Sequence, residues 1–262
     1  STPAEFTRLL ASLHSYPLLA FDYETVPLRC IAGIALANEQ HAWYVQGAAL
    51  AALPAWGEFL QTYKGELIAH NAKYELLVTW EALGILPTSL ALHDTMVMHW
   101  ILTSTPGVND LKSMAKKILA RSVLSYNEVV PPGATVLDIP VELAARYAAS
   151  GYARNTYDLF VWLRDRLYEE ALWDVYDLID RPVIPVLVEM EQAGLVIDRD
   201  ELLKLIIEYV AQREDYAQGL RVLGYIGAPS SGDQLAAWLY DDLGLPITRL
   251  TKSGSRGAVD QK

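Results

Sequence analysis

An apolar stretch that ends in two carboxylates is the feature that most constrains this chain. Residues 16–21 (Tyr-Pro-Leu-Leu-Ala-Phe) predict a buried strand over Leu18–Tyr23, and Asp22 and Glu24 stand at its end. Because strand side chains alternate between faces, the two carboxylates point to the same side. They repel one another unless a cation lies between them, and Mg²⁺, which prefers oxygen ligands, meets that need. Taken alone, the pair is also compatible with a solvated strand end at a loop.

The composition is that of a well-cored globular protein. With 262 residues, 52% hydrophobic and 20% charged, the chain can hold one large domain or one domain with an appendage. No apolar run reaches the roughly 18 residues that span a bilayer, and the first residues lack the pattern of a signal peptide. Cys30 is the only cysteine, which excludes an internal disulfide framework and a cysteine-rich zinc site. We therefore expect a cytoplasmic protein.

The net charge of −11 argues against a protein that binds long stretches of duplex DNA, because phosphate contacts require lysine and arginine. It leaves open a protein that holds a few nucleotides of a single strand around metal ions.

The first hundred residues predict an α/β domain with a mixed sheet. Asp94 is expected to cap a helix over 95–102, since its carboxylate can accept from the N–H groups of the first turn. A hairpin is expected at residues 38–40. The predicted strands are Leu18–Tyr23, Cys30–Ala37, His41–Gln46 and Glu66–His70, and the predicted helices are Ala49–Tyr63 and Lys73–Leu83.

Helices dominate from Asn109 onward. One long or kinked helix is expected over Val141–Tyr168, and a second unit is expected to begin near Leu172. Further helices are expected over Leu172–Met190, from Asp198 or Asp200 to about Leu223, and over Asp233–Asp242, before a polar end at Thr248–Lys262.

Short motifs follow one another in a defined order. They are Asp22-x-Glu24-Thr25, His70-Asn-Ala-Lys-Tyr-Glu75, His93-Asp-Thr-Met96 and Arg146-Tyr-Ala-Ala-Ser150. In this order and spacing they resemble the 3′→5′ proofreading exonuclease domain of family A DNA polymerases, the bacterial DNA polymerase I type. The stretch from Pro182 to Asp198 resembles the junction with the polymerase thumb, and Leu243–Gly254 resembles the thumb segment that follows.

The resemblance implies a fold and a division of the chain. Residues 1–170 are expected to form the exonuclease-like domain, an RNase H-like mixed sheet flanked by helices. Residues 171–262 are expected to form a mainly helical segment, the beginning of a polymerase domain that stops before the palm. The chain alone is therefore not expected to polymerise.

The resemblance also implies a site with two Mg²⁺ (or Mn²⁺) ions held by four acids at a DNA 3′ end. Asp22, Glu24 and Glu75 match metal-binding catalytic acids, and Tyr147 matches a tyrosine that orients the attacking water. Leu28 matches a side chain that wedges against the terminal base. The DNA-binding positions implied in this way are Thr25, Leu28, Asn71, Lys73 and Tyr74.

Two departures from the family pattern stand out. The second motif ends in Glu75 where the family has aspartate, and Mg²⁺ tolerates altered geometry badly. The third motif should supply an aspartate four residues after Tyr147, but this position is Gly151, and counting back from the following helix gives Tyr152. Asp158 is expected to be a surface or capping group. The predicted function is therefore a proofreading-type exonuclease domain whose two-metal site is incomplete and whose hydrolysis is weakened or absent.

Other interpretations remain open. A rearranged third motif that recruits another acid would preserve activity, whereas a catalytically silent domain would serve the polymerase as a scaffold or guide single-stranded DNA. A stand-alone RNase D-like exoribonuclease is a further alternative, against which the thumb-like segment argues. His70, His93 and His99 lack the spacing of a zinc set, and His70 is expected to be packed or hydrogen-bonded.

The partners implied are a single-stranded DNA 3′ end or a primer–template and the palm and fingers of the polymerase. A monomer without a membrane partner is expected. The preference for DNA or RNA stays undetermined.

Overall fold

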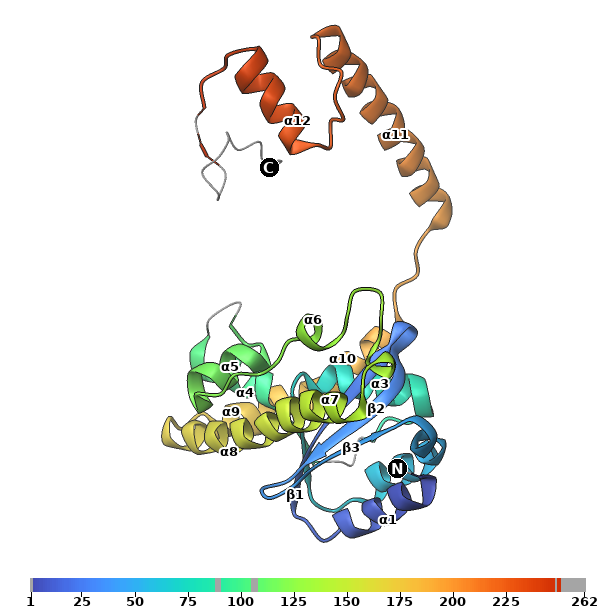
Figure 1. The fold of residues 1–262 in the computed structure, drawn as a ribbon, viewed down its shortest axis with the longest axis vertical. Helices are drawn as coiled ribbons and strands as arrows, with labels where there is room; N and C mark the ends of the chain where they lie inside the picture. Colours follow the sequence, from blue (N-terminus) through green and yellow to red (C-terminus); the bar gives the residue numbers. More distant parts are fainter. Residues whose placement is uncertain (1, 88–90, 105–107, 248, 251–262) are drawn as a thin grey trace. The chain divides into compact units, whose positions relative to one another are not determined.

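A computed structural model describes residues 2–87, 91–104, 108–247 and 249–250. Contacts divide the chain into two compact units, Ser1–Gly194 and Leu195–Lys262, and each unit is described by itself (Figure 1). Most of the predicted polar end at 248–262, including the last residues of the thumb-like segment, lies outside the described residues.

A five-stranded mixed sheet in the order β3-β2-β1-β4-β5 forms the centre of the first unit. The strands are β1 (Leu18–Val26), β2 (Cys30–Ala37), β3 (Ala42–Gln46), β4 (Glu66–Ala69) and β5 (Ala91–Asp94). β1, β2 and β3 pair antiparallel, whereas β1, β4 and β5 pair parallel. Asn38 closes the predicted hairpin, because its side-chain oxygen accepts from the N–H groups of Gln40 (2.9 Å) and His41 (2.7 Å). The mixed sheet was predicted, but β5 was not.

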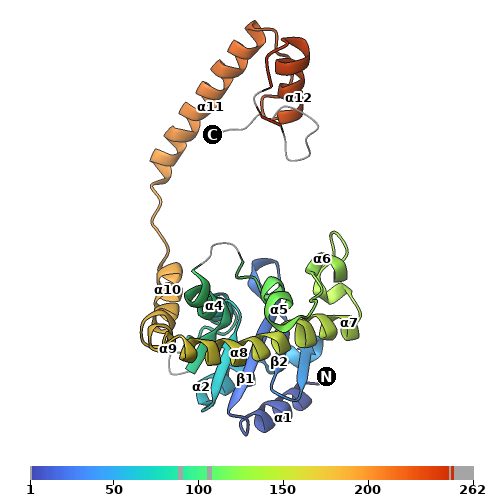
Figure 2. The same ribbon diagram turned by 90° about the vertical axis from the view of Figure 1, so that its left-hand side faces the viewer.

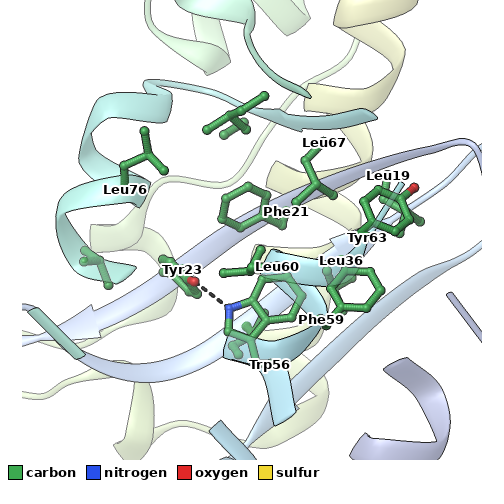
Figure 3. Packing of buried hydrophobic residues seen from close by; sticks show 14 of the residues in the cluster. Leu19, Phe21, Tyr23, Leu36, Trp56, Phe59, Leu60, Tyr63, Leu67 and Leu76 are labelled. Carbon is green, nitrogen blue, oxygen red and sulfur yellow. Dashed lines mark hydrogen bonds between the residues drawn. The ribbon is translucent and has the colours of Figure 1, made fainter. Parts of the chain in front are cut away.

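One face of the sheet packs against the helices α1 (Pro3–Leu13), α2 (Leu53–Thr62), α3 (Ala72–Leu83) and α10 (Arg181–Ala193). Phe21 and Tyr23 of β1 point into this core beside Trp56, as Figure 3 shows. The indole N–H of Trp56 donates to the Tyr23 hydroxyl (2.6 Å), which also shares a hydrogen bond with Thr79 (2.9 Å). These bonds satisfy the buried phenol and fix the rotation of β1, so its alternate residues face the other side.

The opposite face packs against α4 (Thr95–Thr103), α5 (Leu111–Leu119) and α8 (Arg154–Glu169), together with a π-helical segment, η4 (Arg146–Ala153). Figures 1 and 2 show α8 running across this side of the sheet. The long or kinked helix expected over 141–168 consists of α7 (Val141–Ala145), η4 and α8 in succession. Shorter elements complete the unit: η1 (Pro27–Arg29), η2 (Gly47–Ala52), α6 (Tyr126–Val129), η3 (Val136–Asp138), α9 (Trp173–Val175) and η5 (Tyr176–Asp180).

The second unit is helical. α11 (Arg199–Val222) begins at Asp198, whose carboxylate accepts from the N–H groups of Asp200 and Glu201 (3.1 and 3.0 Å). α12 (Gly232–Ala236) and η6 (Ala237–Asp242) follow. Within the described residues, no helix combines the length and the apolar character needed to span a membrane.

Candidate functional site

The two carboxylates at the end of β1 share the face that lies opposite the Phe21–Tyr23 core. Asp22 is partly exposed and Glu24 is 7% exposed, and both lie on the face of β1 that contacts η4; this partly buried region around the acids is called the recess below. β1 pairs with β4 only as far as Ala20. The N–H of Tyr23 is therefore free of the ladder on that edge, and it donates to the Glu75 carboxylate (3.1 Å). The fold thus places Asp22, Glu24 and Glu75 near enough for their charges to act on one another, although not as a metal-binding group.

Asp94 holds the helix that carries Glu75. One Asp94 oxygen accepts from the N–H of Asn71 (3.0 Å), and the other accepts from the N–H of Ala72 (2.8 Å), at the beginning of α3. The same carboxylate caps α4 through the N–H groups of Met96 (2.8 Å) and Val97 (3.4 Å). The predicted cap on α4 is confirmed. The hydrogen bonds from the beginning of α3 to Asp94 were not predicted, because they join residues that only the parallel β4–β5 pair brings together.

Burial and mutual repulsion act on all three acids. Burial raises the pKa of Asp22 to about 7. Burial and the Asp22 charge raise the pKa of Glu24 to about 8. The pKa of Glu75 lies well above its usual range because of burial and the charges of Asp22, Glu24 and Asp94, although the Tyr23 N–H acts in the opposite direction. Burial and mutual repulsion therefore favour the protonated forms of these acids, and a bound cation would oppose that effect.

Two tyrosines of η4 lie over the same recess. In an α-helix, residues five apart point about 140° away from each other, but the wider π turn brings Tyr147 and Tyr152 onto one side. Their ring centroids are 4.8 Å apart, so the two side chains lie in contact. Burial and the nearby charge of Glu24 raise the pKa of Tyr147. Both side chains therefore remain phenols at neutral pH.

The charge of Asp94 also acts on Glu75, but the Asp94 oxygens accept from four backbone N–H groups. Asp158 instead pairs with Arg121 and with Arg154 (3.1 Å), so it serves as an ion-pair partner on the surface of α8. Across the described ranges, no three His, Cys, Asp or Glu side chains are grouped so that they could hold a metal. The carboxylates are the ligand type that Mg²⁺ prefers, but one Glu75 oxygen is committed to a backbone N–H and the third motif supplies phenols. The donor set does not fit a pair of Mg²⁺ ions.

Several of the predicted strand-binding residues surround the end of β1. The Thr25 hydroxyl shares a hydrogen bond with the Tyr74 hydroxyl (2.9 Å). Leu28 is 91% exposed and has a φ of 67°, a conformation that non-glycine residues seldom adopt. Asn71 is also left-handed, with a φ of 65°. Lys73 is turned toward α10, where it pairs with Glu191.

The three histidines are hydrogen-bonded as separate groups. Nδ1 of His70 bonds to the Thr95 hydroxyl (2.9 Å), Nδ1 of His93 to the Tyr176 hydroxyl (3.2 Å), and Nδ1 of His99 to Asn109 (2.6 Å). The expectation that His70 is a hydrogen-bonded residue is confirmed.

A mixed sheet of this order, with carboxylates at the end of its first strand, defines an RNase H-like fold of the exonuclease type. The chain belongs to the 3′-5′ exonuclease family of the DNA polymerase A type, whose family model matches residues 1–167. Among curated relatives, DNA polymerase I of Treponema pallidum is 28% identical over 226 residues, and DNA polymerase I of Pseudomonas aeruginosa is 29% identical over 288 residues. These alignments cover 85% and 98% of this chain but 22% and 30% of the relatives.

Solved structures share the fold at low sequence identity. The POL domain of Pol1 from M. smegmatis, in complex with DNA primer-template and dNTP, matches with a TM-score of 0.60 and 20% identity over 99% of this chain and 43% of that chain. NrnC of Brucella melitensis bound to pGG matches with a TM-score of 0.57 and 18% identity, over 69% of this chain and 87% of that chain. The chain therefore spans less than a third of the length of the two curated relatives above.

Proposed function

We propose that this chain is the proofreading-type exonuclease region of a family A DNA polymerase that binds a DNA 3′ end at β1 and hydrolyses it weakly or not at all. The observation that carries the proposal is the Tyr147–Tyr152 pair, which lies where the family pattern requires an aspartate. The membership of the family supports the substrate, and the exposed Leu28 beside the Thr25–Tyr74 pair supports the binding of a terminal nucleotide.

The π segment explains why both readings of the third motif fit the sequence. A π turn holds one residue more than an α turn, and the N–H of Arg154 accordingly bonds to the carbonyl of Ala149, five residues earlier. Counting forward from Tyr147 places the expected aspartate at Gly151, and counting back from α8 places it at Tyr152. The two counts differ by one because the π turn adds one residue between Tyr147 and α8. Neither residue supplies a carboxylate. Asp22, Glu24 and Glu75 would therefore bind and orient the 3′ end, but they offer fewer metal ligands than two ions require.

The wider setting follows from the relatives. Polymerase I relatives align beyond the family-matched region, which supports palm and fingers as partners, a primer–template as the larger ligand and a cytoplasmic location. The same alignments argue against a stand-alone exoribonuclease. A monomer stays our expectation.

The direct test is digestion of a 5′-labelled single-stranded DNA in Mg²⁺ and in Mn²⁺, with Asp22→Ala as the contamination control. We expect little or no laddering from the 3′ end, and binding of the strand that depends on a free 3′ end. Laddering at the rate of an ordinary proofreading domain, abolished by Asp22→Ala, would overturn the impaired site. An absence of 3′-end binding would overturn the strand-binding role.

A gain of function gives the sharper test. Tyr152→Asp combined with Glu75→Asp restores the two carboxylates that the family pattern requires, so we expect the hydrolysis rate to rise about tenfold or more, equivalent to roughly 1.4 kcal/mol of transition-state stabilisation. Gly151→Asp is the poorer choice, because an added Cβ there would lie 3.3 Å from the Arg146 carbonyl oxygen. Ser150→Asp adds a carboxylate to the exposed side of the same segment and should change nothing.

A further inference from the structure

Two buried polar atoms of β3 have no hydrogen-bond partner among the residues that the structure describes. They are the hydroxyl of Tyr44 and the side-chain oxygen of Gln46. Most buried polar groups in folded proteins are paired, since an unpaired one loses its hydration without compensation. Two such atoms on neighbouring same-face positions of one strand leave a donor and an acceptor for a bound group.

The strand register places both atoms beside the carboxylates of β1. Asp22 is opposite Ala35, which is opposite Tyr44. Glu24 is opposite Gly33, which is opposite Gln46. Partners in an antiparallel pair point to the same face, so the two polar side chains of β3 share the face of Asp22 and Glu24.

Gly33 of β2 lies between β1 and β3 and leaves room for the Tyr44 side chain. A Cβ at this position would lie 2.3 Å from the Tyr44 hydroxyl oxygen, so the phenol occupies the space above the glycine and reaches toward the strand that carries Glu24. Burial and the charges of Glu24 and Asp22 raise the pKa of Tyr44, which keeps its O–H a donor. No side chain larger than hydrogen at residue 33 would permit this approach.

A single hydroxyl group satisfies both orphaned atoms at once. It can accept from the Tyr44 O–H and donate to the Gln46 oxygen, and a sugar that carries it beside Glu24 keeps a second hydroxyl for that carboxylate. A terminal ribose has such a pair of neighbouring hydroxyls, whereas a terminal deoxyribose lacks the 2′-hydroxyl.

We propose that Tyr44 and Gln46 form a subsite for the 2′-hydroxyl of a 3′-terminal ribonucleotide, next to the Asp22–Glu24 pair. The inference rests on the proposed function, since it requires a strand whose 3′ end lies at β1. It goes further, because it assigns the site a preference for a strand that ends in a ribonucleotide, such as a misincorporated one, over a strand that ends in a deoxyribonucleotide. Tyr44 and Gln46 act as specificity-determining residues.

The test compares two 5′-fluorescein decamers, all-deoxythymidine and the same strand with one 3′-terminal uridine, by fluorescence anisotropy in Ca²⁺ and in EDTA. We expect the wild type to bind the ribo-terminated strand about tenfold more tightly, the ratio that two neutral hydrogen bonds provide. Tyr44→Phe and Gln46→Leu each remove one of the two bonds, so each should lower the ratio to about threefold and leave binding of the deoxy strand within twofold. Tyr168→Phe and Gln61→Leu, at exposed positions on other elements, should keep the wild-type ratio.

A change in the ligand tests the same bonds without altering the protein. A 2′-fluoro terminal nucleotide cannot donate to Gln46, so the wild type should bind it like the deoxy strand. Equal binding of the ribo and deoxy strands by the wild type, or an undiminished preference in Tyr44→Phe, would overturn the subsite. Equal weakening of both strands by Tyr44→Phe in Ca²⁺ but not in EDTA would assign the two atoms to a cation-bound water and also overturn it. If binding of the deoxy strand by the wild type did not depend on a free 3′ end, the proposed function itself would be overturned.

Discussion

At the level of single residues, the first unit buries ionisable groups whose preferred charge states differ from those in water. Burial lowers the pKa of His70 and of His93 to about 4, so both imidazoles are neutral in the folded protein at pH 7. Asp22 and Glu24, with pKa values of about 7 and 8, retain protons that the unfolded chain has already lost. Below pH 6.5 the histidines of the unfolded chain also titrate. In that range the two buried histidines make the free energy of unfolding rise with pH, whereas Asp22 and Glu24 make it fall.

Above pH 6.5 the histidines of the unfolded chain keep less than half of their protons, and the acids of the recess outweigh them. The folded state binds more protons than the unfolded state up to the folded pKa of Glu24, about 8, so the free energy of unfolding should fall as pH rises from 6.5 to 8.5. Glu24 contributes roughly 2 kcal/mol of this loss, at about 1.4 kcal/mol per pH unit and bound proton. Asp22 and Glu75 contribute as well, so we expect Glu24→Gln to reduce the fall without abolishing it, measured by urea unfolding at several pH values without divalent cations.

The matched control for this measurement is Glu58→Gln. Glu58 is exposed on α2, and its replacement should leave the pH profile unchanged. An equal loss of stability in the wild type and in Glu24→Gln would contradict the assignment of the protons to this recess.

At the level of elements, η4 decides which side chains meet the recess. Its one extra residue aligns Tyr147 with Tyr152 while Leu159 and Leu163 of α8 keep their places in the core. Deletion of Ser150 should convert η4 to a regular α-helix and shift Tm by less than about 5 °C, because Ser150 is exposed and the π turn already holds a surplus residue. Thermal unfolding followed by circular dichroism measures the shift.

Deletion of Trp162 is the matched comparison in α8. Trp162 lies at the surface, but the loss of one residue from an α-helix rotates all that follow by about 100°, which moves Leu163 and Leu167 out of the core. We expect this variant to be unfolded or far less stable. A similar Tm for both deletions would show that η4 carries no surplus residue.

Sequence patterns predicted the elements that have a local signature. Alternation and turn residues predicted β1 to β4, and Asp94 and Asp198 were expected at helix starts because a cap is a local contact. α1 was missed although Thr2 and Glu5 form a capping box around Pro3. β5 was missed because four residues are too few to show a hydrophobic period. The unpaired atoms of β3 were missed because their place beside the acids of β1 depends on the pairing of several strands.

At the level of the whole molecule, the first compact unit extends well past the family-matched region. The family model ends at residue 167, whereas η5 and α10 still pack on the sheet domain. Tyr176 is fully buried, and its hydroxyl accepts from the N–H of Asp94 (2.9 Å). Ile184 and Val188 of α10 belong to the same core as β1. The segment after residue 170 therefore supports the residue that holds α3 and Glu75.

Truncation tests this dependence. A chain of residues 1–194 should unfold cooperatively, and a chain of residues 1–170 should be marginal or unfolded. The shorter chain loses Tyr176, Ile184 and Val188, which are at most 5% exposed, and each such side chain contributes roughly 1.5–3 kcal/mol of a total of about 5–15 kcal/mol. Thermal unfolding and limited proteolysis of both chains provide the comparison. If residues 1–170 melt at the temperature of residues 1–194, then η5 and α10 are dispensable for the fold, and the hold of Asp94 on α3 must be sufficient without them.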